Sequence, residues 1–73
     1  MSFLEILRRP GVRASSAWIV LVSHEPFGKS GETATKIGVA EEKISVAATA
    51  ALQEARVRGL KGASIVQLTR VVL

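Results

Sequence analysis

The sequence predicts an α+β fold: a three-stranded antiparallel sheet, one long helix packed on one face, and a short N-terminal helix or edge strand. Two patterns lead to this prediction. In residues 41–60, apolar side chains recur at the spacing of one helical face. On both sides of that stretch, β-branched runs bounded by glycine-containing turns are typical of strands. We expect the 73 residues to form a single domain, 1–73.

The N-terminal segment allows two structures. Ser2 and Glu5 have the spacing of a capping box, which would start a helix over 2–9 that Pro10 and Gly11 stop. The alternative is an edge strand over 3–7, which the same turn would lead back toward the first strand of the sheet.

Residues 17–22 are predicted to be the central strand. They are rich in β-branched and aromatic side chains. Trp18, Val20 and Val22 fall on one face, and Ile19 and Leu21 on the other. A strand that is apolar on both faces usually lies between other strands and is covered on both sides.

Two further strands complete the predicted sheet. Proline and glycine mark 25–32 as a loop, and the alternation in 33–39 predicts a second strand that forms an antiparallel hairpin with the first. A third strand, 64–73, follows the turn at 61–62. Because the helix reverses the chain between strands two and three, those strands run the same way. Placing strand one between them gives the order 2-1-3 with only antiparallel pairs.

The predicted helix has an apolar stripe formed by Ile44, Ala47, Ala48, Ala51, Leu52 and Ala55. Four of these residues are alanine, which favours helix and lets a sheet approach closely. Only one face of the sheet is then covered. The other face needs the N-terminal segment, a second copy of the chain or another protein, and this is the main functional inference from the pattern.

The ends of the helix carry different signals. Glu41 and Glu42 are expected to open it, with no capping side chain at the two preceding positions, so that the chain enters the helix directly from the strand. At the other end Gly59 suits the left-handed position that follows a helix, and Leu60 is its expected apolar contact. Glu54 and Arg58 have the spacing of an ion pair on one face.

The composition argues against catalysis. The chain has no Cys, Asp, Asn or Tyr, and it has one His and six Glu. Disulfides and thiolate metal sites are excluded, and most catalytic sets draw on the missing residues. We therefore expect no enzyme, no metal and no cofactor. No apolar run approaches the ~20 residues of a membrane span, and no signal-peptide core is present, so we expect a cytoplasmic protein.

Two motifs were tested for chemistry. Residues 23–30 end like a phosphate loop, but Ser23 stands where its first glycine belongs and a strand follows instead of a helix. Ser23, His24 and Glu25 are the residue types of a hydrolytic triad. Adjacent strand residues point to opposite faces, so they cannot converge. His24 is expected to be a surface histidine at a strand end.

Five residues are candidates for partner binding: Arg8, Arg9, Arg13, Phe27 and Lys29. The arginines cluster around the N-terminal turn, where they either contact phosphate or an acidic protein surface or are simply solvated. Phe27 lies in the loop, where it either anchors a partner or folds back over the core. Trp18 has the residue type of a base-stacking side chain, but on an apolar strand it is expected to be core.

The run 35–68 combines a strand, a glutamate-rich helix start, an alanine-rich helix, Gly59 and a final strand. This order resembles an architecture common among very small phage and mobile-element proteins, including some inhibitors of CRISPR effector complexes. The expected function is a non-catalytic binding protein that occupies a surface on a larger protein or nucleoprotein complex, with a phage-type inhibitor as the form that the resemblance implies. The alternatives are a nucleic-acid-binding accessory protein, favoured by the net charge of +4, and a structural homo-oligomer.

Overall fold

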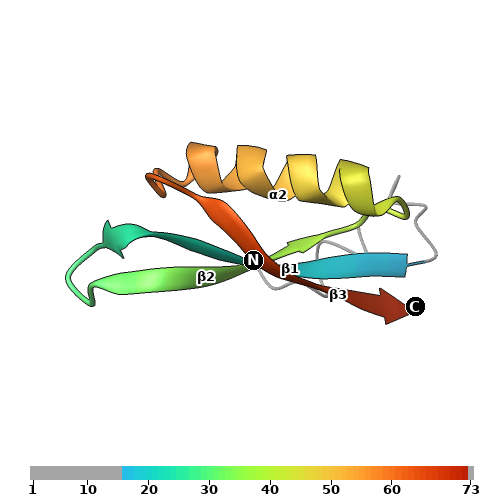
Figure 1. Ribbon diagram of the computed structural model, residues 1–73, viewed down its shortest axis with the longest axis horizontal. Coiled ribbons are helices and arrows are strands. Elements are labelled where there is room, and N and C mark those ends of the chain that lie inside the picture. Colours follow the sequence, from blue (N-terminus) through green and yellow to red (C-terminus); the bar gives the residue numbers. More distant parts are fainter. Residues whose placement is uncertain (1–15, 73) are drawn as a thin grey trace.

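The computed structural model describes residues 16–72, which form three strands and one helix (Figure 1). Their order is β1 (Ser16–Phe27), β2 (Glu32–Val39), α2 (Ile44–Val57) and β3 (Ser64–Val72). The strands form one antiparallel sheet in the order β2-β1-β3, and α2 lies across one face of it. The predicted α+β class and strand order are confirmed. The N-terminal helix or edge strand predicted within 2–9 lies outside the described residues.

The central strand is longer than the sequence predicts. β1 continues to Phe27, so the connection to β2 shrinks from the predicted 25–32 to the four residues 28–31. Its register against β2 shifts between Ser23 and Phe27, and Pro26 lies in this irregular stretch. A proline has no N–H for the ladder, and an irregularity is where a strand tolerates one. Pro26 therefore does not end the strand. It would have ended a strand with regular hydrogen bonds at this position.

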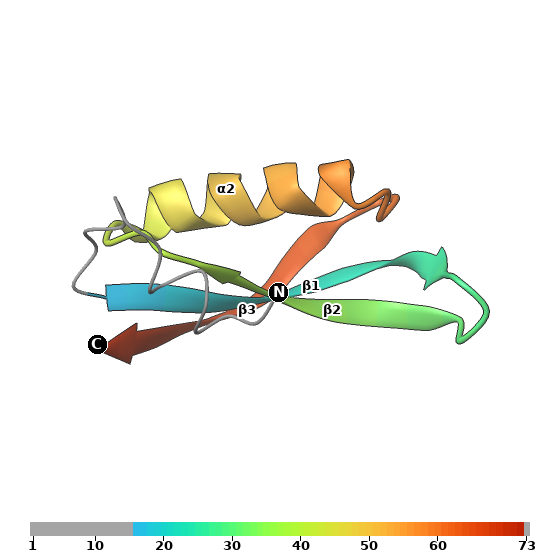
Figure 2. The same ribbon diagram turned by 180° about the vertical axis from the view of Figure 1, so that it is seen from behind.

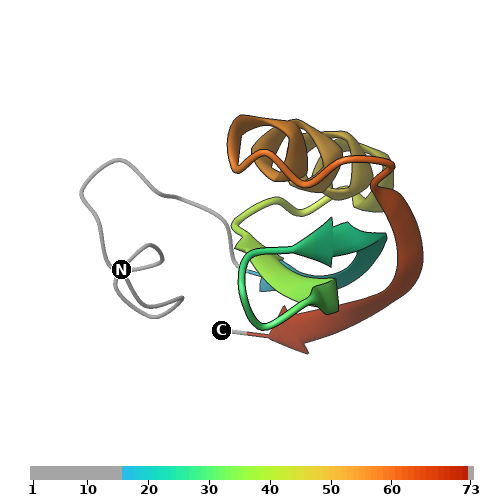
Figure 3. The same cartoon turned by 90° about the vertical axis from the view of Figure 1, so that its left-hand side faces the viewer.

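The core lies between α2 and the sheet (Figure 3). The sheet contributes Val20, Val22, Ile37 and Val39, and the opposite layer contributes Ala47, Ala51, Ala55 and Leu60. Trp18, Ile65 and Leu68 are partly buried against this cluster, as the core assignment of Trp18 predicts. The aliphatic volume thus comes mostly from the strands, while the helix presents alanine.

The apolar stripe of the helix is narrower than predicted. Ala47, Ala51 and Ala55 are completely buried, but Ile44 and Leu52 are 52% and 37% exposed. The expectation that these two belong to the buried stripe is wrong. Alanine brings the helix backbone close to the sheet, and the contact is then too narrow to enclose larger side chains at its borders.

The start of the helix also differs from the prediction. α2 begins at Ile44 after an extended residue, Lys43, and its first turn contains no acidic residue. Glu41 and Glu42 precede the helix, so the expectation that they open it is wrong. The chain leaves β2 at Val39 and must then cross from the sheet layer to the helix layer. Because each extended residue spans about 3.5 Å, several residues are needed before the helix can begin.

The end of the helix follows the prediction. The Leu60 N–H donates to the Ala55 carbonyl at 2.9 Å and the Gly59 N–H to the Arg56 carbonyl at 3.0 Å, which is the hydrogen-bond pair of a Schellman ending. Gly59 has φ +81°, and Leu60 is buried.

Nearby, the expected ion pair forms, with the Nε of Arg58 3.0 Å from the carboxylate of Glu54.

Substitution of Ala51 by leucine tests the close approach of the helix. Ala51 is completely buried against the sheet, so Ala51→Leu is expected to overpack the core and lower the free energy of unfolding by about 1–3 kcal/mol. Gln53→Leu makes the same side chain at an exposed position of the helix and should change it by less than about 0.5 kcal/mol. Urea unfolding measures both. Equal values would contradict the alanine contact.

Candidate binding surface

The face of the sheet that turns away from α2 is the first candidate surface. Ile19 and Leu21 of β1 point to it, because Val20 and Val22 between them are buried under the helix. Their register partners, together with Val71, which pairs with Ala17, extend the surface onto both neighbouring strands. We call this surface the open face; it consists of Ile19, Leu21, Lys36, Gln67, Thr69 and Val71.

The open face has an apolar centre and polar borders. Ile19, Leu21 and Val71 are half-buried, whereas Lys36, Gln67 and Thr69 are exposed. Among residues 16–72, no helix or second sheet lies on this side, as the views from the front, the back and the end agree (Figures 1, 2 and 3). A surface with an apolar centre and polar borders is suited to another protein surface.

His24 is buried on the helix side of β1, where the sequence led us to expect a surface histidine. Its Nδ1 lies 2.7 Å from the backbone oxygen of Glu25, and its Nε2 lies 2.8 Å from Oγ1 of Thr35 on β2. A carbonyl oxygen only accepts, so Nδ1 carries the proton and, in the neutral ring, Nε2 accepts from the threonine hydroxyl. The side chain is satisfied inside the fold and links the two strands of the hairpin.

Ser23 and His24 do not meet. The Ser23 hydroxyl lies 2.9 Å from the hydroxyl of Ser64 on β3, whereas His24 bonds to Thr35 on β2. The two side chains lie on opposite faces of the sheet, as the alternation along a strand predicts. They therefore form no nucleophile and base pair.

Phe27 and Lys29, two of the predicted binding residues, lie at the far end of the hairpin. Phe27 is 46% exposed, and its ring edge is 3.7 Å from the position of a Cβ built on Gly59. The ring thus rests partly against the end of α2 and is not part of the core cluster. Lys29 is exposed in the loop, and a strand follows it, which does not fit a phosphate loop.

The hairpin is tied to the connection between α2 and β3. The Glu25 N–H donates to the Lys61 carbonyl at 2.8 Å, and the Glu25 side chain lies beside Gly62. This contact holds the far end of β1 and β2 against the turn that follows the helix.

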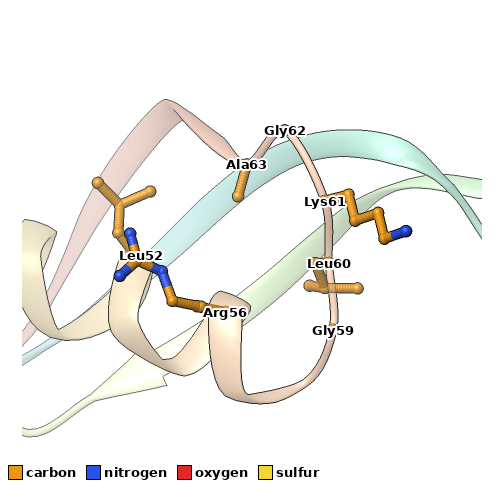
Figure 4. A pocket seen from close by; sticks show the side chains of 7 residues that line it. All are labelled: Leu52, Arg56, Gly59, Leu60, Lys61, Gly62 and Ala63. Carbon is orange, nitrogen blue, oxygen red and sulfur yellow. The ribbon is translucent and has the colours of Figure 1, made fainter.

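Two shallow hollows flank this junction, and sequence reasoning did not predict them. The larger has a volume of about 510 Å³ and is lined by Leu52, Arg56, Gly59, Leu60, Lys61, Gly62 and Ala63 (Figure 4). The second shares Gly59 and Lys61 with it and reaches Phe27. The two glycines of the connection were the available signal. In Figure 4, the Lys61 side chain points away from Leu52 and Arg56, so the cations do not converge on one ligand position.

Trp18 is half-buried on the helix side, and the guanidinium carbon of Arg70 lies 5.9 Å from its ring centroid. This geometry is a cation–π contact between β1 and β3. Because Arg70 lies over the ring and the side chain is partly buried against the core cluster, Trp18 does not offer a free ring to a nucleobase.

The remaining predicted site residues, Arg8, Arg9 and Arg13, lie outside the described residues. Within 16–72, no three His or Glu side chains are grouped as metal ligands, and α2 is too short and too polar to cross a bilayer. No protein-family model, curated protein or solved structure matches the chain.

The link between His24 and Thr35 can be tested with a threonine pair on one strand. Thr35→Val keeps the shape of the side chain but leaves Nε2 of buried His24 without its donor, so we expect a loss of about 1 kcal/mol in the free energy of unfolding. Thr33→Val at an exposed position of β2 is the matched control and should change little. Nitrogen-15 NMR should also find neutral His24 protonated at Nδ1; protonation at Nε2 would contradict the assignment.

Proposed function

We propose that this chain is a cytoplasmic, non-catalytic binding protein that acts by occupying a surface on a larger protein or nucleoprotein complex. The observation that carries the proposal is the open face. One layer of helix covers one side of the sheet, and the described chain places no second layer on the other side. An apolar centre such as that of Ile19 and Leu21 favours a partner that removes it from water.

The chemistry of the other surfaces supports a binding role. Two pairs of polar side chains on β1 and its neighbours are engaged with one another: His24 with Thr35, and Ser23 with Ser64. The hollows at the end of α2 are shallow and bring together no convergent set of acid, base and nucleophile. A small protein of this kind acts by blocking what its partner would otherwise contact, which is the mode of an inhibitor.

Lys36 gives the open face its charge. It lies beside Leu21 in the register of β1 and β2, and its side chain is exposed. A partner that covers the apolar centre would bring this ammonium into the interface, where an acidic or phosphate group is its natural counterpart. Partner binding is therefore expected to depend on both an apolar contact and one positive charge.

Site-specific photo-crosslinking in a lysate of the source cells tests the proposal. A photoreactive residue at Lys36 should trap one protein or nucleoprotein partner, whereas the same residue at Gln53, on the exposed side of α2, should not. With the purified partner, Lys36→Glu is expected to weaken binding at least about tenfold through lost charge pairing. Lys43→Glu makes the same charge change away from the open face and should leave the affinity unchanged.

Two results would contradict the proposal. One is capture of the same partner with equal yield from Gln53, which would place binding on the helix. The other is trapping of nucleic acid alone from Lys36, with affinity that falls steeply as salt rises. That result would favour the nucleic-acid-binding alternative, because phosphate contacts release counterions.

A further inference from the structure

The outer edge of β3 is a second candidate binding surface. β3 pairs with β1 on one side, and no strand of residues 16–72 pairs with its other side (Figure 3). Alternate residues of an edge strand direct their backbone N–H and C=O groups outward, where another strand can bond to them. The edge therefore offers hydrogen bonds in addition to side-chain contacts.

The two edges of the sheet are protected differently. β2, on the opposite border, carries Lys36 at its centre and Gly38 near its end, and both features discourage the addition of a strand. β3 contains no proline, glycine or acidic residue. Its one charge, on Arg70, is drawn inward over Trp18 of the central strand. Nothing in β3 therefore repels an incoming strand.

The side chains of β3 leave room for such a strand. Val66 and Val72 are 59% and 80% exposed, so these apolar side chains are open to contact with an added strand. The register of β3 against β1 shifts next to Val66, and from Gln67 to Val72 the ladder is regular. Residues 67–69 therefore lie in a part of the edge to which a strand can bond without distortion.

We propose that this edge pairs, antiparallel, with β3 of a second copy of the chain, with the two-fold axis at Leu68. Leu68 then faces Leu68 of the second copy, and on either side of it Gln67 faces Thr69. The result is a continuous sheet with three strands from each copy, in which both helices lie on one side. Both open faces lie on the other side and stay free, so this inference does not depend on the proposed function.

The charge on β3 is compatible with this register and excludes a nearby one. With the axis at Leu68, each Arg70 lies level with the irregular position Val66 of the second copy, and the two guanidinium groups are four residues, about 13 Å, apart along the strands. An axis at Arg70 would set the two cations directly opposite, which destabilises a strand pair. Around the axis the strand is thus complementary to itself: Leu68 faces Leu68, and the Gln67 amide faces the Thr69 hydroxyl.

Two double variants of the full chain test the register. Gln67→Lys with Thr69→Lys places two ammonium groups opposite each other twice across the proposed interface. It should raise the dissociation constant of the dimer at least about tenfold. Gln67→Lys with Thr69→Glu uses the same exposed positions but sets opposite charges face to face, and should keep or strengthen the dimer. Circular dichroism verifies that each variant folds.

Sedimentation equilibrium gives the readout, with the wild type expected at twice the chain mass of 7.8 kDa. A wild type that stays monomeric at its highest soluble concentration would overturn the proposal. So would a dimer that responds equally to both variants. A monomer whose outward β3 amides are nevertheless protected from exchange would also overturn it, because another segment of the same chain would then hold the edge.

Discussion

The contact between α2 and the sheet depends on alanine. Ala47, Ala51 and Ala55 are all completely buried, and they let the helix backbone lie close above Val20 and Ile37. A larger residue at any of these three positions would lift the helix and open the core on both sides. The rest of the structure is arranged around this short distance: the borders of the helix stay exposed, and the aliphatic volume comes from the strands.

A helix held by such a narrow stripe needs other anchors. The Schellman ending fixes its last turn and places Leu60 in the core. The backbone bond from Glu25 to Lys61 then joins that turn to the far end of the hairpin, and His24 links the two hairpin strands through Thr35. These contacts lie at the end of the helix that precedes β3. The beginning of the helix has no side-chain cap, so the two ends are secured unequally.

Local patterns in the sequence predict most of this fold. The strand order follows from the reversal of the chain by one helix, and the helix end follows from Gly59 and Leu60, which act on their own neighbours. Features that depend on distant residues were not predictable in the same way. His24 can be buried because Thr35, eleven residues away in the sequence, donates a hydrogen bond from its hydroxyl to Nε2. The charges of Glu41 and Glu42 are typical of the first turn of a helix. The helix begins later because the chain first has to pass from the sheet layer to the helix layer.

The candidate surfaces differ in the same respect. The open face is implied by the alternation of Ile19 and Leu21 with buried residues, which any strand pattern reveals. The hollows form where the 59–63 connection lies against both the helix and the hairpin. No residue spacing in the sequence predicts that arrangement. Phe27 combines the two cases. Its residue type predicts a contact residue, while its position against Gly59 depends on the fold.

The narrow helix contact also bears on what a partner would do to the chain. A small domain buries a modest share of its surface, and here one layer of the core is mostly alanine. Covering the open face would remove Ile19, Leu21 and Val71 from water only in the folded chain, since the unfolded chain does not assemble that surface. Any partner that binds there stabilises the fold by mass action, in proportion to the logarithm of its concentration. Recognition and folding of this chain therefore draw on apolar residues from opposite faces of the same sheet.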